Sequence, residues 1–193
     1  MALEEALESY PKEIETRKGL RCTIRPLQAD DHAAYCEFFT SMHQQELIYI
    51  KHRVNDAEVV RDWCVNVDLG RILPLLGIAD GKIIGVSTLH QQLGGWKRHI
   101  GRLSTNIRPD HRGKGLAIRL MEEAIDIARQ CGLQRMEAEF MGQQEHGLKL
   151  CAQLGFTELY RMEDYVKDMQ AVTHDYIMMG LDLKTDEEYA GMG

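Results

Sequence analysis

The most informative stretch of the sequence is IRPDHRGKGLA, residues 107–117. It follows an irregularly alternating stretch, 99–107, and leads into residues 116–131, where apolar side chains recur at three- and four-residue steps. The first amides of a helix have no intrahelical acceptor, and the helix dipole places about half a positive charge there. A glycine-rich turn between a strand and a strong helix therefore predicts an anion-binding site.

The residues of this turn suit a pyrophosphate. Arg112 and Lys114 add full positive charge, while Gly113 and Gly115 can take positive φ and let an anion approach the backbone. The alternative is a turn that merely joins two elements. Two other nucleotide motifs fit poorly, because the chain has no Walker A string and a dinucleotide fingerprint starting at Gly113 would require a small residue where Ile118 stands.

The rest of the chain alternates between strand and helix patterns, which predicts an α/β fold with a mixed sheet and helices on its faces. An Asp-Gly pair between two apolar runs is the strongest hairpin signal. The expected elements are a helix or unsettled arm in 1–18, a strand over 22–25, a helix capped by Asp30, a helix over 56–68 stopped by Gly70, a hairpin over 72–79 and 82–89 joined by Asp80 and Gly81, a strand over 99–107, the helix stopped by Gly132, a strand over 133–141, a helix ending at Gly155, and strands over 156–167 and 173–183.

Composition excludes several classes of protein. The chain has 193 residues, enough for one domain, and its net charge of −7 lacks the positive footprint that sequence-independent nucleic-acid binding requires. No apolar run is long enough to cross a bilayer and the start is acidic, so we expect a cytoplasmic protein with no membrane partner. Five scattered cysteines predict reduced thiols. The histidines form no H-E-x-x-H pattern, so no metal is expected.

Taken together, these features resemble the GNAT superfamily of N-acetyltransferases. Its signature for the turn that holds the CoA pyrophosphate, [Q/R]-x-x-G-x-[G/A], is matched by Arg112, Gly115 and Ala117. The likeness covers roughly residues 20–183, and it includes the stretches 24–26, 29–31, 154–156 and 175–178. It implies an N-acetyltransferase domain over 19–183, preceded by a helical arm over 1–18 and followed by a tail over 184–193.

The resemblance implies a mostly antiparallel sheet of about seven strands, splayed into a V between two parallel strands, with helices on both faces. Acetyl-CoA, or another acyl-CoA, would lie in the V as cosubstrate. Backbone groups of the strand end would bind the pantetheine arm and the acyl carbonyl, and the turn would bind the pyrophosphate. The cofactor-binding residues implied in this way are Thr105, Asn106, Ile107, Arg112, Gly113, Lys114, Gly115, Leu116, Ala117 and Gln144.

Two catalytic residues are implied by the same likeness. Glu139 matches a glutamate that serves some members as the base for the amine, and Cys151 stands where many members carry a tyrosine that protonates the CoA thiolate. Each has an alternative: Glu139 as a solvated carboxylate and Cys151 as a small core residue. Two further positions depart from the family, since Gln144 replaces an asparagine, and Arg102 replaces an acidic residue of bacterial protein-lysine acetyltransferases.

The resemblance thus implies acyl transfer from acetyl-CoA to a primary amine by direct attack in a ternary complex. The acceptor would be a small molecule, or a lysine or N-terminus of a protein. A different hypothesis is a non-catalytic CoA-binding module of the same fold, which Cys151, Gln144 and Arg102 favour. The oligomeric state stays open and includes a homodimer.

Overall fold

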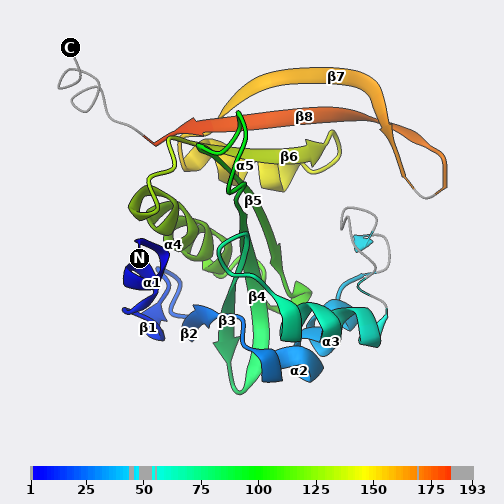
Figure 1. The fold of residues 1–193 in the computed structure, drawn as a ribbon. Coiled ribbons are helices and arrows are strands. Elements are labelled where there is room, and N and C mark those ends of the chain that lie inside the picture. Colours follow the sequence, from blue (N-terminus) through cyan, green and yellow to red (C-terminus); the bar gives the residue numbers. More distant parts are fainter. Residues whose placement is uncertain (1, 44–45, 48–53, 55, 169, 184–193) are drawn as a thin grey trace, which may run out of the picture.

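A single eight-stranded sheet runs through the computed structural model, which describes residues 2–43, 46–47, 54, 56–168 and 170–183 (Figure 1). The strands follow the order β1-β2-β3-β4-β5-β6-β8-β7. Their bounds are β1 Lys12–Glu15, β2 Arg21–Pro26, β3 Ile72–Ala79, β4 Lys82–His90, β5 Ile100–Ile107, β6 Arg135–Met141, β7 Thr157–Lys167 and β8 Thr173–Asp182. The mixed α/β class with a mostly antiparallel sheet is confirmed.

Helices cover both faces of this sheet. Helix α4 packs on β3, β4 and β5 together with the short α1, while α2 and α3 pack on each other and lie over the opposite face (Figure 1). The bounds are α1 Ala2–Leu7, α2 His32–Thr40, α3 Ala57–Asn66, α4 Leu116–Gln130 and α5 Glu145–Gln153, with 3-10 turns at Ala29–Asp31 and Pro109–His111. Among the described residues no helix is long and apolar enough to cross a membrane.

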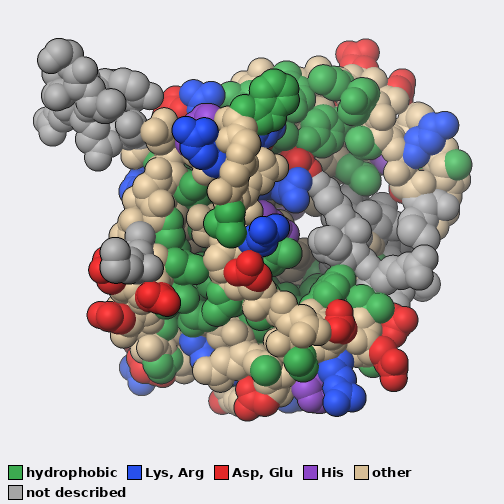
Figure 2. Space-filling model, viewed as in Figure 1, with side chains coloured by type: hydrophobic (Ala, Val, Ile, Leu, Met, Phe, Trp, Pro, Cys, Tyr) green, Lys and Arg blue, Asp and Glu red, His purple; other side chains and the backbone are tan. Residues whose placement is uncertain are grey.

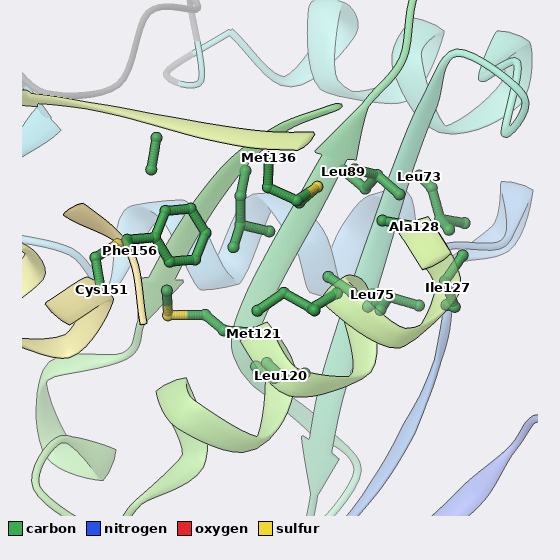
Figure 3. Close-up of a cluster of buried hydrophobic side chains, with 14 of the residues drawn as sticks. Leu73, Leu75, Leu89, Leu120, Met121, Ile127, Ala128, Met136, Cys151 and Phe156 are labelled. Carbon is green, nitrogen blue, oxygen red and sulfur yellow. The ribbon is translucent and has the colours of Figure 1, made fainter. Parts of the chain in front are cut away.

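Side-chain alternation along the strands produces two cores. Leu75, Leu89 and Leu103 pack against α4, whose Leu120 and Ile127 are fully buried (Figure 3). Neighbouring residues such as Leu76 and Val86 point the other way, toward the aromatic side chains of α2. The sheet is therefore packed from both sides at β3 and β4.

The sheet divides between β5 and β6, its one parallel pair. The ladder lasts for three residue pairs, ending at Arg102 and Glu137. Beyond it β5 stays paired with β4 as far as Ile107, and β6 stays paired with β8 as far as Met141. Figure 1 shows β6 lying along β8 while β5 runs beside β4. We call the space between residues 103–107 and 138–141 the split, and it confirms the expected V.

Most predicted elements are confirmed, with three differences. Asp80 and Gly81 turn the hairpin with positive φ, as expected. Asp30 is not a helix cap: it lies inside the 3-10 turn Ala29–Asp31, and Asp31 occupies the N-cap position of α2. Helix α3 ends at Asn66, before Gly70, and the arm holds a strand, β1, that was not expected. The predicted tail, 184–193, lies outside the described residues, and the domain boundaries stay a prediction.

Candidate functional site

The turn between β5 and α4, residues 108–115, has the backbone geometry that an anion site requires. Gly113 and Gly115 take φ values of 73° and 83°, and α4 begins at Leu116. A Cβ added to Gly113 would meet nothing within 4 Å, and the residue is exposed, so this side of the turn is open. The amides at the start of the fifteen-residue α4 therefore lie beside an accessible surface.

The other side of the turn rests on the N-terminal arm. The Thr16 hydroxyl donates a hydrogen bond of 2.7 Å to the Lys114 carbonyl oxygen, and a Cβ on Gly115 would lie 3.5 Å from the Thr16 Cβ. The arm itself is tied to α4, because the buried carboxylate of Glu123 accepts bonds of 2.7 Å from both Tyr10 and Lys12. Residues outside the expected domain thus brace the turn, and no local pattern around Thr16 signals this.

Arg112, the first residue of the turn signature, is engaged within the protein. Its Nε donates to the Ile107 carbonyl at 3.1 Å, and its two terminal nitrogens lie 2.5 and 2.7 Å from the carboxylate oxygens of Glu46. The hydrogen bonds from Arg112 lower the pKa of Glu46. Arg112 therefore links the end of β5 to the connection between α2 and α3, and sequence reasoning did not identify Glu46.

Backbone groups of β5 point into the split at alternate residues. The Arg108 N–H bonds to Ile84 of β4 at 3.0 Å, and groups facing one antiparallel partner alternate along a strand. Thr105 and Ile107 therefore direct their N–H and carbonyl groups away from β4, where no described strand pairs beyond Arg102. The Thr105 hydroxyl lies 2.8 Å from that of Ser87, so its side chain is held against β4.

The β6 side of the split carries charged and aromatic side chains. Glu139 and Arg102 form an ion pair of 3.3 Å across the division of the sheet. The Glu139 side chain is 15% exposed and that of Arg102 is 46% exposed. Tyr176 of β8 pairs with Met141. Its pKa is raised to about 12 by burial, by Tyr160 and by Glu137, and Arg102 opposes the rise. These groups therefore form one electrostatically coupled cluster.

Two predicted residues have other partners. Gln144 precedes α5, and its Oε1 accepts the Met141 N–H at 2.8 Å, closing the turn after β6. Cys151 is fully buried beside Phe156 in the core against α4 (Figure 3). Burial raises the pKa of the Cys151 thiol to about 12. This placement supports the alternative of a core residue.

The surface is hollowed between the layer of β7 and β8 and helices α2 and α3 (Figure 2). A separate polar recess, lined by Gln91, Arg98, His99 and Gln134, lies at the opposite end of β5 from the turn. The described residues contain no group of histidine, cysteine, aspartate or glutamate side chains that could hold a metal ion. The candidate site is therefore the split and the turn next to it.

Two relatives are similar to this chain in sequence. An Escherichia coli K12 protein named L-amino acid N-acyltransferase MnaT is 27% identical over 164 residues, which span 82% of this chain and 95% of the relative. A Salmonella typhimurium L-methionine sulfoximine/L-methionine sulfone acetyltransferase is 35% identical over 83 residues, which span 40% of this chain and 48% of that protein.

Solved structures agree in fold. Salmonella typhimurium yncA, solved with its cofactor acetyl-CoA, superposes with a TM-score of 0.72 at 25% identity, over 85% of this chain and 95% of that one. The ribosomal-protein-S5-alanine acetyltransferase of Vibrio fischeri reaches 0.77 at 17% identity, over 90% and 97% of the two chains, and supports the fold alone. The model of the acetyltransferase (GNAT) family matches residues 31–156. With the split sheet and the glycine turn in place, this match shows that the chain belongs to the GNAT family of acetyltransferases.

Proposed function

We propose that this chain is an acyl-CoA-dependent N-acyltransferase that moves an acetyl group from acetyl-CoA to a primary amine. The observation that carries the proposal is the open glycine turn at the head of α4, next to a split into which β5 directs backbone groups. The acetyl-CoA bound to yncA supports the cosubstrate. The name of the E. coli relative supports amino acids among the acceptors.

The turn would hold the pyrophosphate of CoA mainly through its backbone. The N–H groups around Gly113, Gly115 and Ala117 lie at the start of the helix, where an anion is favoured. Arg112 already bonds to Ile107 and Glu46, so Lys114 is the turn cation assigned to the phosphates. In this arrangement Arg112 holds the end of β5 in position next to the turn, which accounts for its place in the signature without a direct phosphate contact.

The pantetheine arm would run along β5 in the split. Thr105 offers an N–H and a carbonyl group, whereas the Ile107 carbonyl is used by Arg112. An N–H of Thr105 aimed at the acyl oxygen would stabilise the oxyanion of the tetrahedral intermediate, a contribution of about 3 kcal/mol in comparable sites. Asn106 points its backbone groups toward β4 and would contact the cofactor through its side chain. Gln144 would contact it through Nε2.

The reaction needs a neutral amine. Its nitrogen attacks the thioester carbon, a C–N bond forms, the C–S bond breaks, and CoA leaves as the thiolate. We assign the proton released from nitrogen to Glu139, which lies on the face of β6 away from α4 and accepts a charge-assisted bond from Arg102. With its pKa raised to about 12, Cys151 is a poorer acid than an ordinary thiol, so the thiolate would take its proton from solvent.

A pair of variants at Gly113 tests CoA binding. Gly113→Glu and Gly113→Gln carry the same strain at positive φ and place side chains of equal size in open space. Only the glutamate adds a negative charge beside the phosphates. We expect calorimetric titration to give at least fivefold weaker acetyl-CoA binding for the glutamate variant than for the glutamine variant. Equal affinities, or no binding by the wild-type protein, would remove the proposal.

The non-catalytic CoA-binding module remains a second candidate, and the burial of Cys151 favours it because the position of the thiol proton donor lies in the core. Release of CoA thiol from acetyl-CoA separates the two candidates. Turnover with any amine in a panel of amino acids, polyamines and peptides would exclude the non-catalytic module. Tight binding of acetyl-CoA without turnover would support it.

A further inference from the structure

We propose that Arg102 selects the acceptor: its guanidinium binds a carboxylate that the acceptor carries next to its amine, in exchange for part of its contact with Glu139. This inference rests on the proposed function.

The position of Arg102 in the fold suits this role. It is the last β5 residue that pairs with β6, so it lies where the split begins. Leu103 is buried on the α4 face of the sheet, so the adjacent Arg102 points to the other face. On β6, Met136 and Ala138 are buried toward α4, which directs Glu139 to the same face as Arg102. The ion pair therefore lies beside the split, on the face that bears α2 and α3.

The guanidinium has donors to offer a ligand. A bond of 3.3 Å to Glu139 uses one of the five N–H donors of an arginine side chain, and 46% of the Arg102 side chain is exposed. The guanidinium is the more exposed partner of the pair, so it can turn toward a ligand while Glu139, at 15% exposure, stays in place. A planar carboxylate, in contrast, can take two parallel bonds from the guanidinium. Exchange of partners is therefore favourable when an acceptor brings a carboxylate.

The charge pattern of the cluster matches a zwitterion. Arg102 presents a positive group and Glu139 a negative group 3.3 Å apart, across two strands. An α-amino acid carries the opposite pattern on neighbouring atoms, with its carboxylate directed to Arg102 and its amine to Glu139. A lysine side chain or a polyamine offers no anion to Arg102. The class of acceptor that this cluster fits is an amine with an adjacent carboxylate.

The test compares amino acids with their carboxamides. L-methionine, L-leucine and L-phenylalanine are each assayed against the matching carboxamide, with saturating acetyl-CoA. Wild-type protein should prefer the carboxylate by roughly tenfold or more in kcat/KM, and Arg102→Gln should reduce the preference to within about threefold. The α-amine of an amino-acid carboxamide is less basic than that of the amino acid, so a larger fraction of it is neutral and reactive at neutral pH. This difference favours the carboxamide and therefore acts against the expected preference for the carboxylate.

Arg135→Gln is the matched control. Arg135 lies on β6 at the closed end of the split, is 45% exposed and pairs with Asp182 of β8 at 2.7 Å. It should keep the wild-type preference. If Arg102→Gln slowed amino acids and carboxamides by the same factor, Arg102 would be a structural residue and the inference would be overturned. The same conclusion would follow if wild-type protein showed no preference for the carboxylate.

Acetyl-CoA binding separates this inference from the proposed function. If acetyl-CoA bound and carboxylate-free amines reacted best, only the role of Arg102 would fail; if it did not bind, the acyltransferase proposal would fail as well. A binding measurement tests the inference even if the protein shows no turnover. N-acetyl-L-methionine should bind the CoA complex roughly tenfold more tightly than its carboxamide, and Arg102→Gln should abolish the difference. Equal binding of the two by wild-type protein would overturn the inference.

Discussion

The two sides of the split present different chemistry. On the β5 side, backbone groups, two glycines and a helix start form the site, and side chains mainly hold this backbone in place. On the β6 side, the site consists of charged and aromatic side chains, including Glu139 and Tyr176, and Arg102 from the closed end of β5 joins them through its ion pair with Glu139. This difference suggests that the first side binds what all reactions of the family share, and that the second determines what differs between members.

The largest effect should come from a largely buried ion pair in the same half of the sheet as β5, between β2 and the turn before α2. Arg25 of β2 donates two bonds of 2.6 Å to Asp31, whose side chain is 10% exposed. Asp31→Asn leaves Arg25, whose side chain is only 21% exposed, without its charge partner and should cost about 3 kcal/mol in denaturant unfolding. Asp182→Asn, at an exposed pair on β8, should cost less than about 0.5 kcal/mol. Equal costs would contradict the comparison.

This stability difference should depend on pH in one direction. Burial opposes ionisation of Asp31, but hydrogen bonds from Arg25 and the Gln28 N–H outweigh it and lower its pKa. A lowered pKa in the folded state means that the contribution is complete above about pH 5 and is lost as pH falls below the usual aspartate value of about 4. The gap between wild-type protein and Asp31→Asn should therefore narrow between pH 5 and pH 3.

Two glycines test packing on either side. A Cβ at Gly85 of β4 would lie 2.7 Å from Ile107 and 2.9 Å from Leu116, a side chain that is fully buried at the start of α4. A Cβ at Gly180 of β8 would lie equally close to Leu159, but that side chain is 44% exposed and can move. We expect Gly85→Ala to cost about 2 kcal/mol and to weaken acetyl-CoA binding.

Gly180→Ala should cost less than about 1 kcal/mol and leave acetyl-CoA binding unchanged. Both alanines restrict the unfolded chain similarly, so the difference between the two variants isolates crowding in the folded state. Thermal unfolding and titration with acetyl-CoA measure the two effects. A Gly180→Ala protein that lost cofactor affinity would show that the β6 side also shapes the shared part of the site.

The smallest effect concerns the anion next to the turn. Glu46→Gln removes a negative charge that lies against Arg112, so the phosphates would meet a more positive surface. Acetyl-CoA affinity should rise about two- to fivefold, and less at high salt. Glu158→Gln, which disturbs an exposed arginine pair on β7, should change nothing. Weaker acetyl-CoA binding by Glu46→Gln would mean that the two bonds between Glu46 and Arg112 are required to shape the turn.

The sequence predicted those parts of the fold that depend on local signals. The glycine turn, the periodicity of α4 and the Asp80-Gly81 hairpin are each written within about fifteen residues, and each is confirmed. The missed contacts join distant residues: Thr16 meets Lys114 across 98 positions, and Arg112 meets Glu46 across 66. Such pairs leave no periodic trace in one sequence.

The candidate site was foreseen to different degrees. The direction of the Thr105 and Ile107 backbone groups follows from strand alternation once the split is known, and the resemblance had pointed to both residues; their contact with the cofactor stays a prediction. The pairing of Arg102 with Glu139, 37 positions apart, could not be predicted from the sequence, because it depends on the register of the three-residue parallel ladder. The resemblance implied a proton donor at Cys151, whereas its helical spacing suggested a core residue, and its burial supports the second. The catalytic assignments themselves stay predictions.

The short parallel ladder makes β5 a strand with one protected edge and one open edge. Amide protons of Asn106 and Arg108 face β4 and should exchange slowly with deuterated solvent whether or not cofactor is present. The amide protons of Thr105 and Ile107 face the split and should exchange quickly. Their exchange should slow when a ligand with amide groups binds in the split and accepts hydrogen bonds from them. The alternation of slow and fast amide exchange along residues 105–108 thus reports whether the split is occupied.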